Sequence, residues 1–128
     1  MQINLVDLVI EARKEFYDRA ISDYEDIFSS EMPDSATDEY SNAIRFYQSL
    51  NKDDRSMAFQ LARQVLCETV ANVFAWLDGA YFLENQSKIL ELKFEGEEKN
   101  LNTYLHDIWI AIEQGADIDE LRKFYSQL

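Results

Sequence analysis

Few residues in this 128-residue chain are suited to chemistry: one histidine, His106, one cysteine, Cys67, and a glutamate, Glu68, within the most apolar stretch. Cys67 follows two apolar residues, which favours an inert buried thiol over a nucleophile. Burial would raise the pKa of Glu68 and suit it to acid–base work. Gln64 and Asn72, four residues to either side, instead predict a polar stripe that faces water.

Metal and phosphate chemistry have equally little support. His106 has no glutamate three residues before it, so the Glu-x-x-His and His-Glu-x-x-His metal motifs are absent. No EF-hand loop occurs, and Gly79, Gly96 and Gly115 are isolated, whereas phosphate-binding loops are rich in glycine. We therefore expect no cofactor, no metal site and no enzymatic activity, and we expect His106 to be an ordinary helix residue.

The charge is the distinctive feature, since 12 basic residues stand against 25 acidic ones and give a net charge of −13. Such a chain repels nucleic acid and anionic membranes, so neither is expected as a direct partner. No lysine or arginine occurs between Ala20 and Ile44. This stretch contains the residues that we predict to contact a partner: Asp23, Tyr24, Glu25, Asp26, Glu31, Asp34, Asp38, Glu39 and Tyr40.

Acidic residues mixed with aromatic ones are typical of a surface where a basic protein docks, because aromatics anchor and acids steer the approach. In size, acidity and predicted helicity the chain resembles immunity proteins that neutralise nuclease-type toxins; no motif matches residue by residue, so no site is carried over. A solvated acidic face without a partner is the plainer interpretation. A second acid-only run comprises Asp107, Glu113, Asp117, Asp119 and Glu120.

The alternative function is a helical adaptor, or a self-associating scaffold subunit such as a homodimer, which binds through an apolar groove. Salt would matter little to such an apolar contact, whereas it would weaken binding to a basic protein.

The elements expected to position these residues are helices. Apolar residues recur at helical spacing from Leu5 to Phe28, after a cap at Asn4. Further helices are expected from about Ser35 to Leu50, with a capping pair of Ser35 and Asp38, then at 55–77, 101–114 and 118–126. Gly115 should end the fourth helix, and Asp117 should cap the last.

The third of these helices has the widest apolar face and is expected to be the central, most buried one. Its face comprises Ala58, Leu61, Ala62, Val65, Thr69, Val73, Trp76 and Leu77. Residues 79–100 alternate apolar and charged types near Ile89, so a short β-hairpin or an irregular loop around 81–96 both fit.

Together these patterns predict an all-α fold: an up-and-down bundle of four to five helices in a single domain spanning residues 1–128. No stretch is long and apolar enough to span a membrane, and the N-terminal residues lack the features of a signal peptide. A cytoplasmic location is therefore expected.

Overall fold

The computed structural model describes residues 4–127 and is all-helical, with no strand among them. One long helix runs from Leu5 to Phe28 as α1 (Leu5–Arg13), a π-helical turn η1 (Lys14–Asp18) and α2 (Arg19–Phe28). It is followed by α3 (Glu39–Ser49), α4 (Lys52–Leu77), α5 (Leu105–Glu113) and α6 (Ile118–Ser126). The predicted all-α helical bundle is confirmed.

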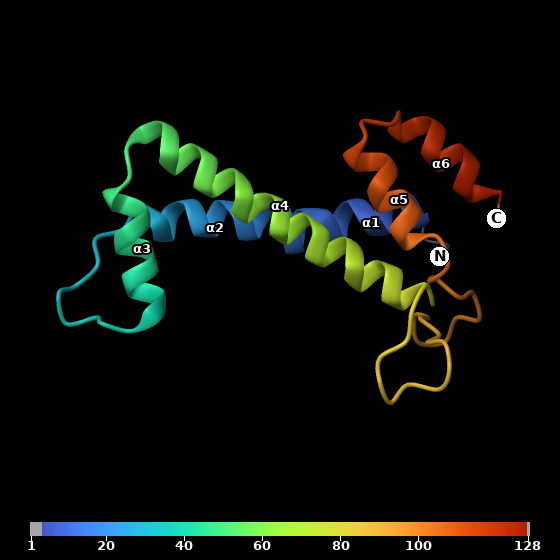
Figure 1. Ribbon diagram of the computed structural model, residues 1–128. Helices are drawn as coiled ribbons and strands as arrows, with labels where there is room; N and C mark the ends of the chain where they lie inside the picture. Colours follow the sequence, from blue (N-terminus) through green and yellow to red (C-terminus); the bar gives the residue numbers. More distant parts are fainter. Residues whose placement is uncertain (1–3, 128) are drawn as a thin grey trace.

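The two long helices cross, and the short helices gather at their opposite ends (Figure 1). One end contains the C-terminus of α2, α3 and the start of α4. The other contains α1, the C-terminal half of α4, α5 and α6. Between the crossing helices, α4 packs on the π-helical turn η1.

Most of the buried core lies at the end that contains α5 and α6. Trp109 on α5 is fully buried, with its ring centroid 5.7 Å from that of Phe74 and 6.1 Å from that of Tyr17. The guanidinium of Arg13 stacks over both the Trp109 and the Tyr17 rings, and Arg13 also pairs with Glu113. This cluster holds α1, α4 and α5 together, because each of these helices contributes a side chain to it or lies directly against it.

Helix boundaries follow local caps, several of which were predicted. Asn4 accepts a hydrogen bond from the Val6 amide, and Asp117 accepts one from the Glu120 amide. Gly115 has a φ of +79°, as expected for the residue that ends α5. Asn51 accepts from the Asp54 amide and starts α4 at Lys52, three residues before the predicted position.

The predicted start of the second helix at Ser35 is wrong. The helix α3 begins at Glu39, because Asp38 is itself the N-cap and accepts hydrogen bonds from the amide and the hydroxyl of Ser41. A cap needs an extended backbone, and Asp38 has a ψ of 162°, so Asp38 cannot also lie in the first helical turn. Residues 29–37 form turns instead.

The fourth predicted helix also starts later than expected, at Leu105 rather than Leu101. Its first turn receives an external cap, since the His106 amide donates to the Asp78 carboxylate, 2.7 Å away at the end of α4. Burial of this carboxylate raises the pKa of Asp78 above its usual value.

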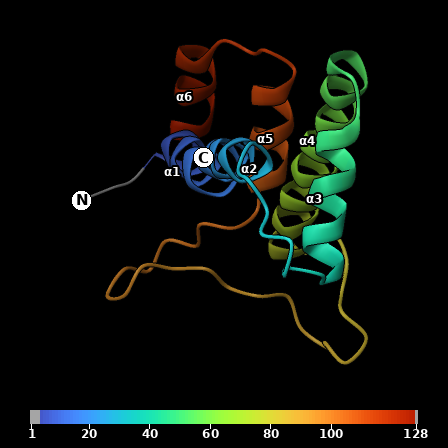
Figure 2. The same cartoon turned by 90° about the vertical axis from the view of Figure 1, so that its left-hand side faces the viewer.

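Residues 79–100 are irregular, so the loop alternative fits and the hairpin alternative does not. Figure 2 shows most of this segment extending away from the helices. It is tied down by Asn102, which is 3% exposed. The Asn102 amide group donates to the carbonyls of Leu77 and Leu90, and its side-chain oxygen accepts from the Leu92 amide.

The prediction that the third helix is the most buried one is wrong. Only Ala71, Phe74 and Ala75 are buried on α4, all in its C-terminal half. Leu61 and Val65 are 69% and 63% exposed, although they belong to the predicted apolar face. The apolar face exists, but its N-terminal part is largely uncovered in the described chain, where Ala62 borders a small apolar cavity against Ile21 and Tyr24 of α2. Among the described residues, no helix is both long and apolar enough to cross a bilayer.

Candidate functional site

The nine predicted contact residues lie together at the end of the molecule formed by α2, the turns of residues 29–38 and α3 (Figure 1). We call the segment from Asp23 to Tyr40 the acidic end. All nine residues are exposed. Tyr24 and Tyr40 are 41% and 50% exposed, which leaves their rings available to a partner.

An aromatic cluster holds this end together. The ring of Phe28 lies 5.0 Å from that of Tyr47 on α3 and 5.8 Å from that of Phe59 on α4, between centroids. Tyr24 packs on the same Phe28 ring at 5.7 Å. Phe28 thus joins three helices, and Tyr24 is positioned by that contact.

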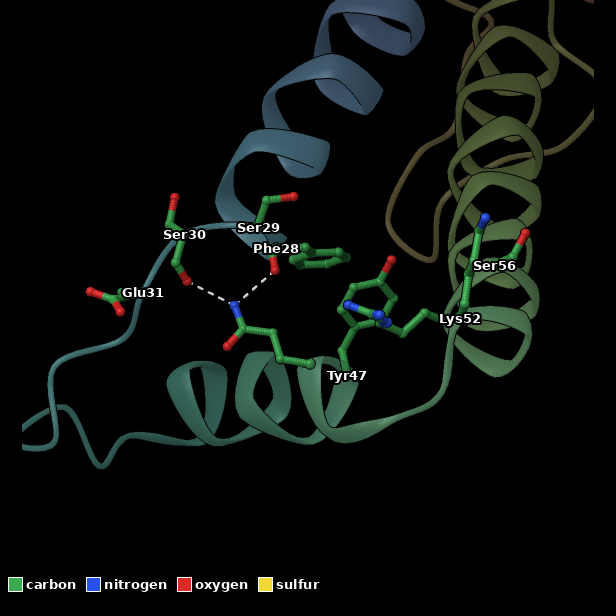
Figure 3. A pocket seen from close by; sticks show the side chains of 9 residues that line it. Phe28, Ser29, Ser30, Glu31, Tyr47, Lys52 and Ser56 are labelled. Carbon is green, nitrogen blue, oxygen red and sulfur yellow. Dashed lines mark hydrogen bonds between the residues drawn. The ribbon is translucent and has the colours of Figure 1, made fainter.

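Gln48 fixes the path of the chain after α2. Its side-chain amide donates to the carbonyl oxygens of Phe28 and Ser30, at 2.8 and 2.7 Å, as the dashed lines in Figure 3 mark. These two carbonyl oxygens lie at and just after the C-terminus of α2, where the helix supplies no hydrogen-bond donor for them. The Gln48 side chain on α3 supplies that donor. Arg45, also on α3, donates to the carbonyl of Pro33, which accepts from the Ala36 amide as well.

The carboxylates of the acidic end have no basic partners. Within residues 4–127, no lysine or arginine nitrogen lies within 4.0 Å of a carboxylate oxygen of these seven side chains: Asp23, Glu25, Asp26, Glu31, Asp34, Asp38 and Glu39. Asp38 alone has a structural task, and the hydrogen bonds from Ser41 hold the pKa of its carboxyl below the usual value. The other six are exposed charges that do no structural work in the described chain.

The second acidic run differs from the acidic end in this respect. Glu113 pairs with Arg13, Asp119 pairs with Arg122, and Asp117 caps α6. Most acidic side chains of that run therefore form ion pairs or cap a helix within the fold. The cap at Asp117 and the pair of Asp119 with Arg122 are local contacts, whereas the pair of Glu113 with Arg13 depends on the packing of α1 against α5.

A groove of about 490 Å³ opens beside the acidic end, between the C-terminus of α2 and the start of α4 (Figure 3). Its walls include Glu31 and Ser30 on one side and Lys52 and Arg55 on the other, with Tyr47 between them. Tyr47, Lys52 and Arg55 are not among the predicted contact residues. Helical periodicity predicts Tyr47 on the second helix and Arg55 at the start of the third, but nothing in the spacing shows that these helices meet α2 here.

The groove therefore adds two cations to an otherwise acidic surface. A partner that fits this end would place basic groups over the carboxylates and an acidic or carbonyl group towards Lys52 and Arg55. Such a mixed pattern gives a docking surface a defined orientation as well as an attraction.

The residues considered for chemistry are not gathered into a site. Glu68 is exposed on α4 and accepts a hydrogen bond from Gln64, as the polar-stripe interpretation predicted. Cys67 is half-buried against the core, and His106 is half-buried at the start of α5. Among residues 4–127, no three His, Cys, Asp or Glu side chains lie close enough together to hold a metal ion.

Comparison with known proteins adds no assignment: no protein-family description, no curated protein and no solved structure matches this chain.

Proposed function

We propose that this protein binds a basic protein partner through the acidic end and neutralises or inhibits it, as an immunity protein does for a nuclease-type toxin. The observation that supports this proposal is the set of seven exposed carboxylates without a lysine or arginine partner in the described chain. Like charges in one segment repel one another and disfavour the fold slightly. A basic partner would remove that repulsion on binding.

The geometry favours the acidic end over other charged surfaces for a second reason. Its charges are combined with the exposed rings of Tyr24 and Tyr40 and with the groove beside Tyr47. Aromatic anchors next to a cavity supply affinity at the centre of an interface, while surrounding charges raise the association rate. A cytoplasmic location is part of the proposal, since a neutralising protein of this kind would act there on behalf of the cell's own nucleic acid.

The test compares two variants that each remove three negative charges. The acidic-end variant is Asp23→Asn, Glu25→Gln and Asp26→Asn, three exposed side chains without hydrogen-bond or ion-pair partners in the described chain. The control is Glu95→Gln, Glu97→Gln and Glu98→Gln, which are equally exposed and lie in the segment 79–100. Both variants have the same net charge, so a difference between them reports the place of the charge rather than its amount.

Immobilised wild-type protein should capture from a lysate of its native cell a basic protein that is released by salt. The control variant should capture the same protein, and the acidic-end variant should not. With the purified partner, the association rate at low salt should fall about tenfold or more for the acidic-end variant. Equal association rates for the two variants would refute the proposal.

The alternative function, a helical adaptor or a self-associating scaffold subunit that binds through an apolar groove, would use a different part of the molecule: the outward-facing side of α4.

A further inference from the structure

The outward-facing side of α4 carries an uncovered apolar ridge, flanked on one side by the exposed polar stripe of Gln64, Glu68 and Asn72. It presents Met57, Leu61, Val65 and Val73, which are 66%, 69%, 63% and 47% exposed. Ala62 and Thr69 are exposed between them. These residues lie at helical spacings of three and four, so they share one side of the helix over roughly 24 Å. We call these six residues the α4 face.

The chain covers this side of α4 only at its C-terminal end. There the Tyr81 hydroxyl donates to the Asn72 carbonyl at 2.8 Å, and the Trp76 indole N–H donates to Gln86 at 2.6 Å. Both contacts come from the segment 79–100. Ala62 lies at the edge of the α4 face that borders α2 and lines a small apolar cavity with Ile21 and Tyr24. Met57, Leu61 and Val65 are exposed, and their apolar side chains meet water.

The total surface exceeds that of a compact monomer, and both the α4 face and the extended segment 79–100 contribute to the excess. The accessible surface is 9274 Å², whereas a compact monomer of 15.0 kDa has roughly 7,000 Å². The excess of roughly 2,200 Å² is more than twice the ~800 Å² that each partner buries in a standard protein–protein interface. Covering the α4 face would therefore leave the chain closer to the surface expected for its mass.

The charges on α4 indicate what covers it. Along its 26 residues, three basic side chains, Lys52, Arg55 and Arg63, balance three acidic ones, Asp53, Asp54 and Glu68. The helix is thus neutral, although the chain has a net charge of −13. A basic partner would gain no electrostatic attraction here. A second copy of this acidic chain would meet less repulsion here than at the acidic end.

We propose that two copies of this protein associate through their α4 faces and form a symmetric homodimer. A twofold axis brings the same surface of both copies together, so one apolar face is sufficient for a closed assembly. Residues spaced by four, such as Met57, Leu61 and Val65, form the ridges that interdigitate when two helices cross at about −50°. The small residues Ala58 and Ala62 beside them leave room for the ridge of the other copy.

In this dimer the acidic ends remain on the outside, since they lie on α2, α3 and the turns between them rather than on α4. The dimer does not depend on the proposed binding of a basic partner, and each can fail without the other. The effect of salt concentration distinguishes dimer formation from binding of a basic partner. Screening should strengthen association between two copies of net charge −13, whereas it should weaken binding of a basic protein.

The experiment measures the mass of the purified full-length protein by sedimentation equilibrium over a wide range of concentration. The wild type should reach twice its 15.0 kDa mass. The variant Leu61→Glu with Val65→Glu should raise the dissociation constant at least about a hundredfold, because four carboxylates would be buried across the twofold axis. Both sites are exposed in one copy, so the variant should fold normally, which circular dichroism checks.

The matched control is Leu83→Glu with Phe124→Glu, two exposed apolar residues on other surfaces, 53% and 60% exposed. It should dimerise like the wild type. Cys67 is the sole cysteine, so cross-linking can be tested in a Cys67→Ser background. There Val65→Cys should form a disulfide between the two copies of the dimer, and Phe124→Cys should not. A wild type that remains monomeric, or a dimer unaffected by the charges at 61 and 65, would overturn the proposal. Either result would leave the α4 face to a partner of another kind.

Discussion

Replacing Asn102 with alanine should destabilise the protein more than its position in an irregular segment suggests. Asn102 is 3% exposed and its side chain makes three hydrogen bonds: to the Leu77 and Leu90 carbonyls and from the Leu92 amide. Each neutral hydrogen bond contributes about 1 kcal/mol, and a buried group left without a partner costs about 1–3 kcal/mol. The Leu92 amide also has Asn100 as an acceptor, at 3.1 Å, so the alanine variant leaves it a second partner.

We therefore expect Asn102→Ala to lower the free energy of unfolding by about 2–4 kcal/mol, which is a large share of the ~5–15 kcal/mol typical of a domain. Urea denaturation followed by circular dichroism measures this loss. Hydrogen exchange at the Leu92 amide should accelerate in the same variant, since the segment 79–100 loses its attachment to the end of α4.

The control is Asn100→Ala, the same substitution two residues earlier at an exposed site with one hydrogen bond. It should cost less than about 1 kcal/mol. A loss below about 1 kcal/mol for Asn102→Ala, or equal losses for the two variants, would refute the account of how residues 79–100 are held.

Three further predictions concern charged side chains. Burial raises the pKa of Asp78, so the folded protein keeps a proton on this carboxyl that the unfolded chain has already lost, and the free energy of unfolding falls as pH rises from 3.8 through the raised pKa. The stability of Asp78→Asn relative to the wild type should therefore increase over that pH interval in urea titrations. A stability difference that does not change with pH would contradict this. The lowered pKa of Asp38 has the opposite effect on stability: the Asp38 carboxylate stabilises α3 above pH 3.8, and this stabilisation is lost as pH falls through the lowered pKa. Asp38→Ala should therefore have less helix than the wild type near neutral pH and the same helix content in acid. Finally, Arg13→Met should cost about 1–2 kcal/mol by loss of the stacking on Trp109 and the pair with Glu113, and it should change the Trp109 fluorescence; an unchanged spectrum would show that the stacking is absent in solution.

The features of this fold that depend on neighbouring residues could be predicted from the sequence. The long helix from Leu5 to Phe28, the caps at Asn4 and Asp117, and the terminator Gly115 depend on side chains within one turn of the backbone groups they satisfy. The same reasoning placed α3 at Ser35 because two residues there, Ser35 and Asp38, can cap a helix. Sequence alone does not decide between two adequate caps.

Features that depend on contacts distant in sequence were missed. An apolar helix face predicts burial only if another element covers it, and most of the α4 face stays exposed in the described chain. Likewise, the role of Asn102 depends on three backbone groups up to 25 residues away. The composition of the acidic end was evident from the sequence, but its lack of ion pairs was not. In the similar run from Asp107 to Glu120, Asp119 pairs locally with Arg122, whereas the pair of Glu113 with Arg13 forms only in the folded chain.

The most direct test of the proposed function is the association rate between this protein and its basic partner, measured by stopped flow as ionic strength rises from low to physiological values. The account predicts a steep fall for the wild type and for the control with Glu95, Glu97 and Glu98 neutralised. The variant neutralised at Asp23, Glu25 and Asp26 should start lower and depend less on salt. A wild-type rate that does not change with salt would contradict the assignment of the acidic end as the binding surface.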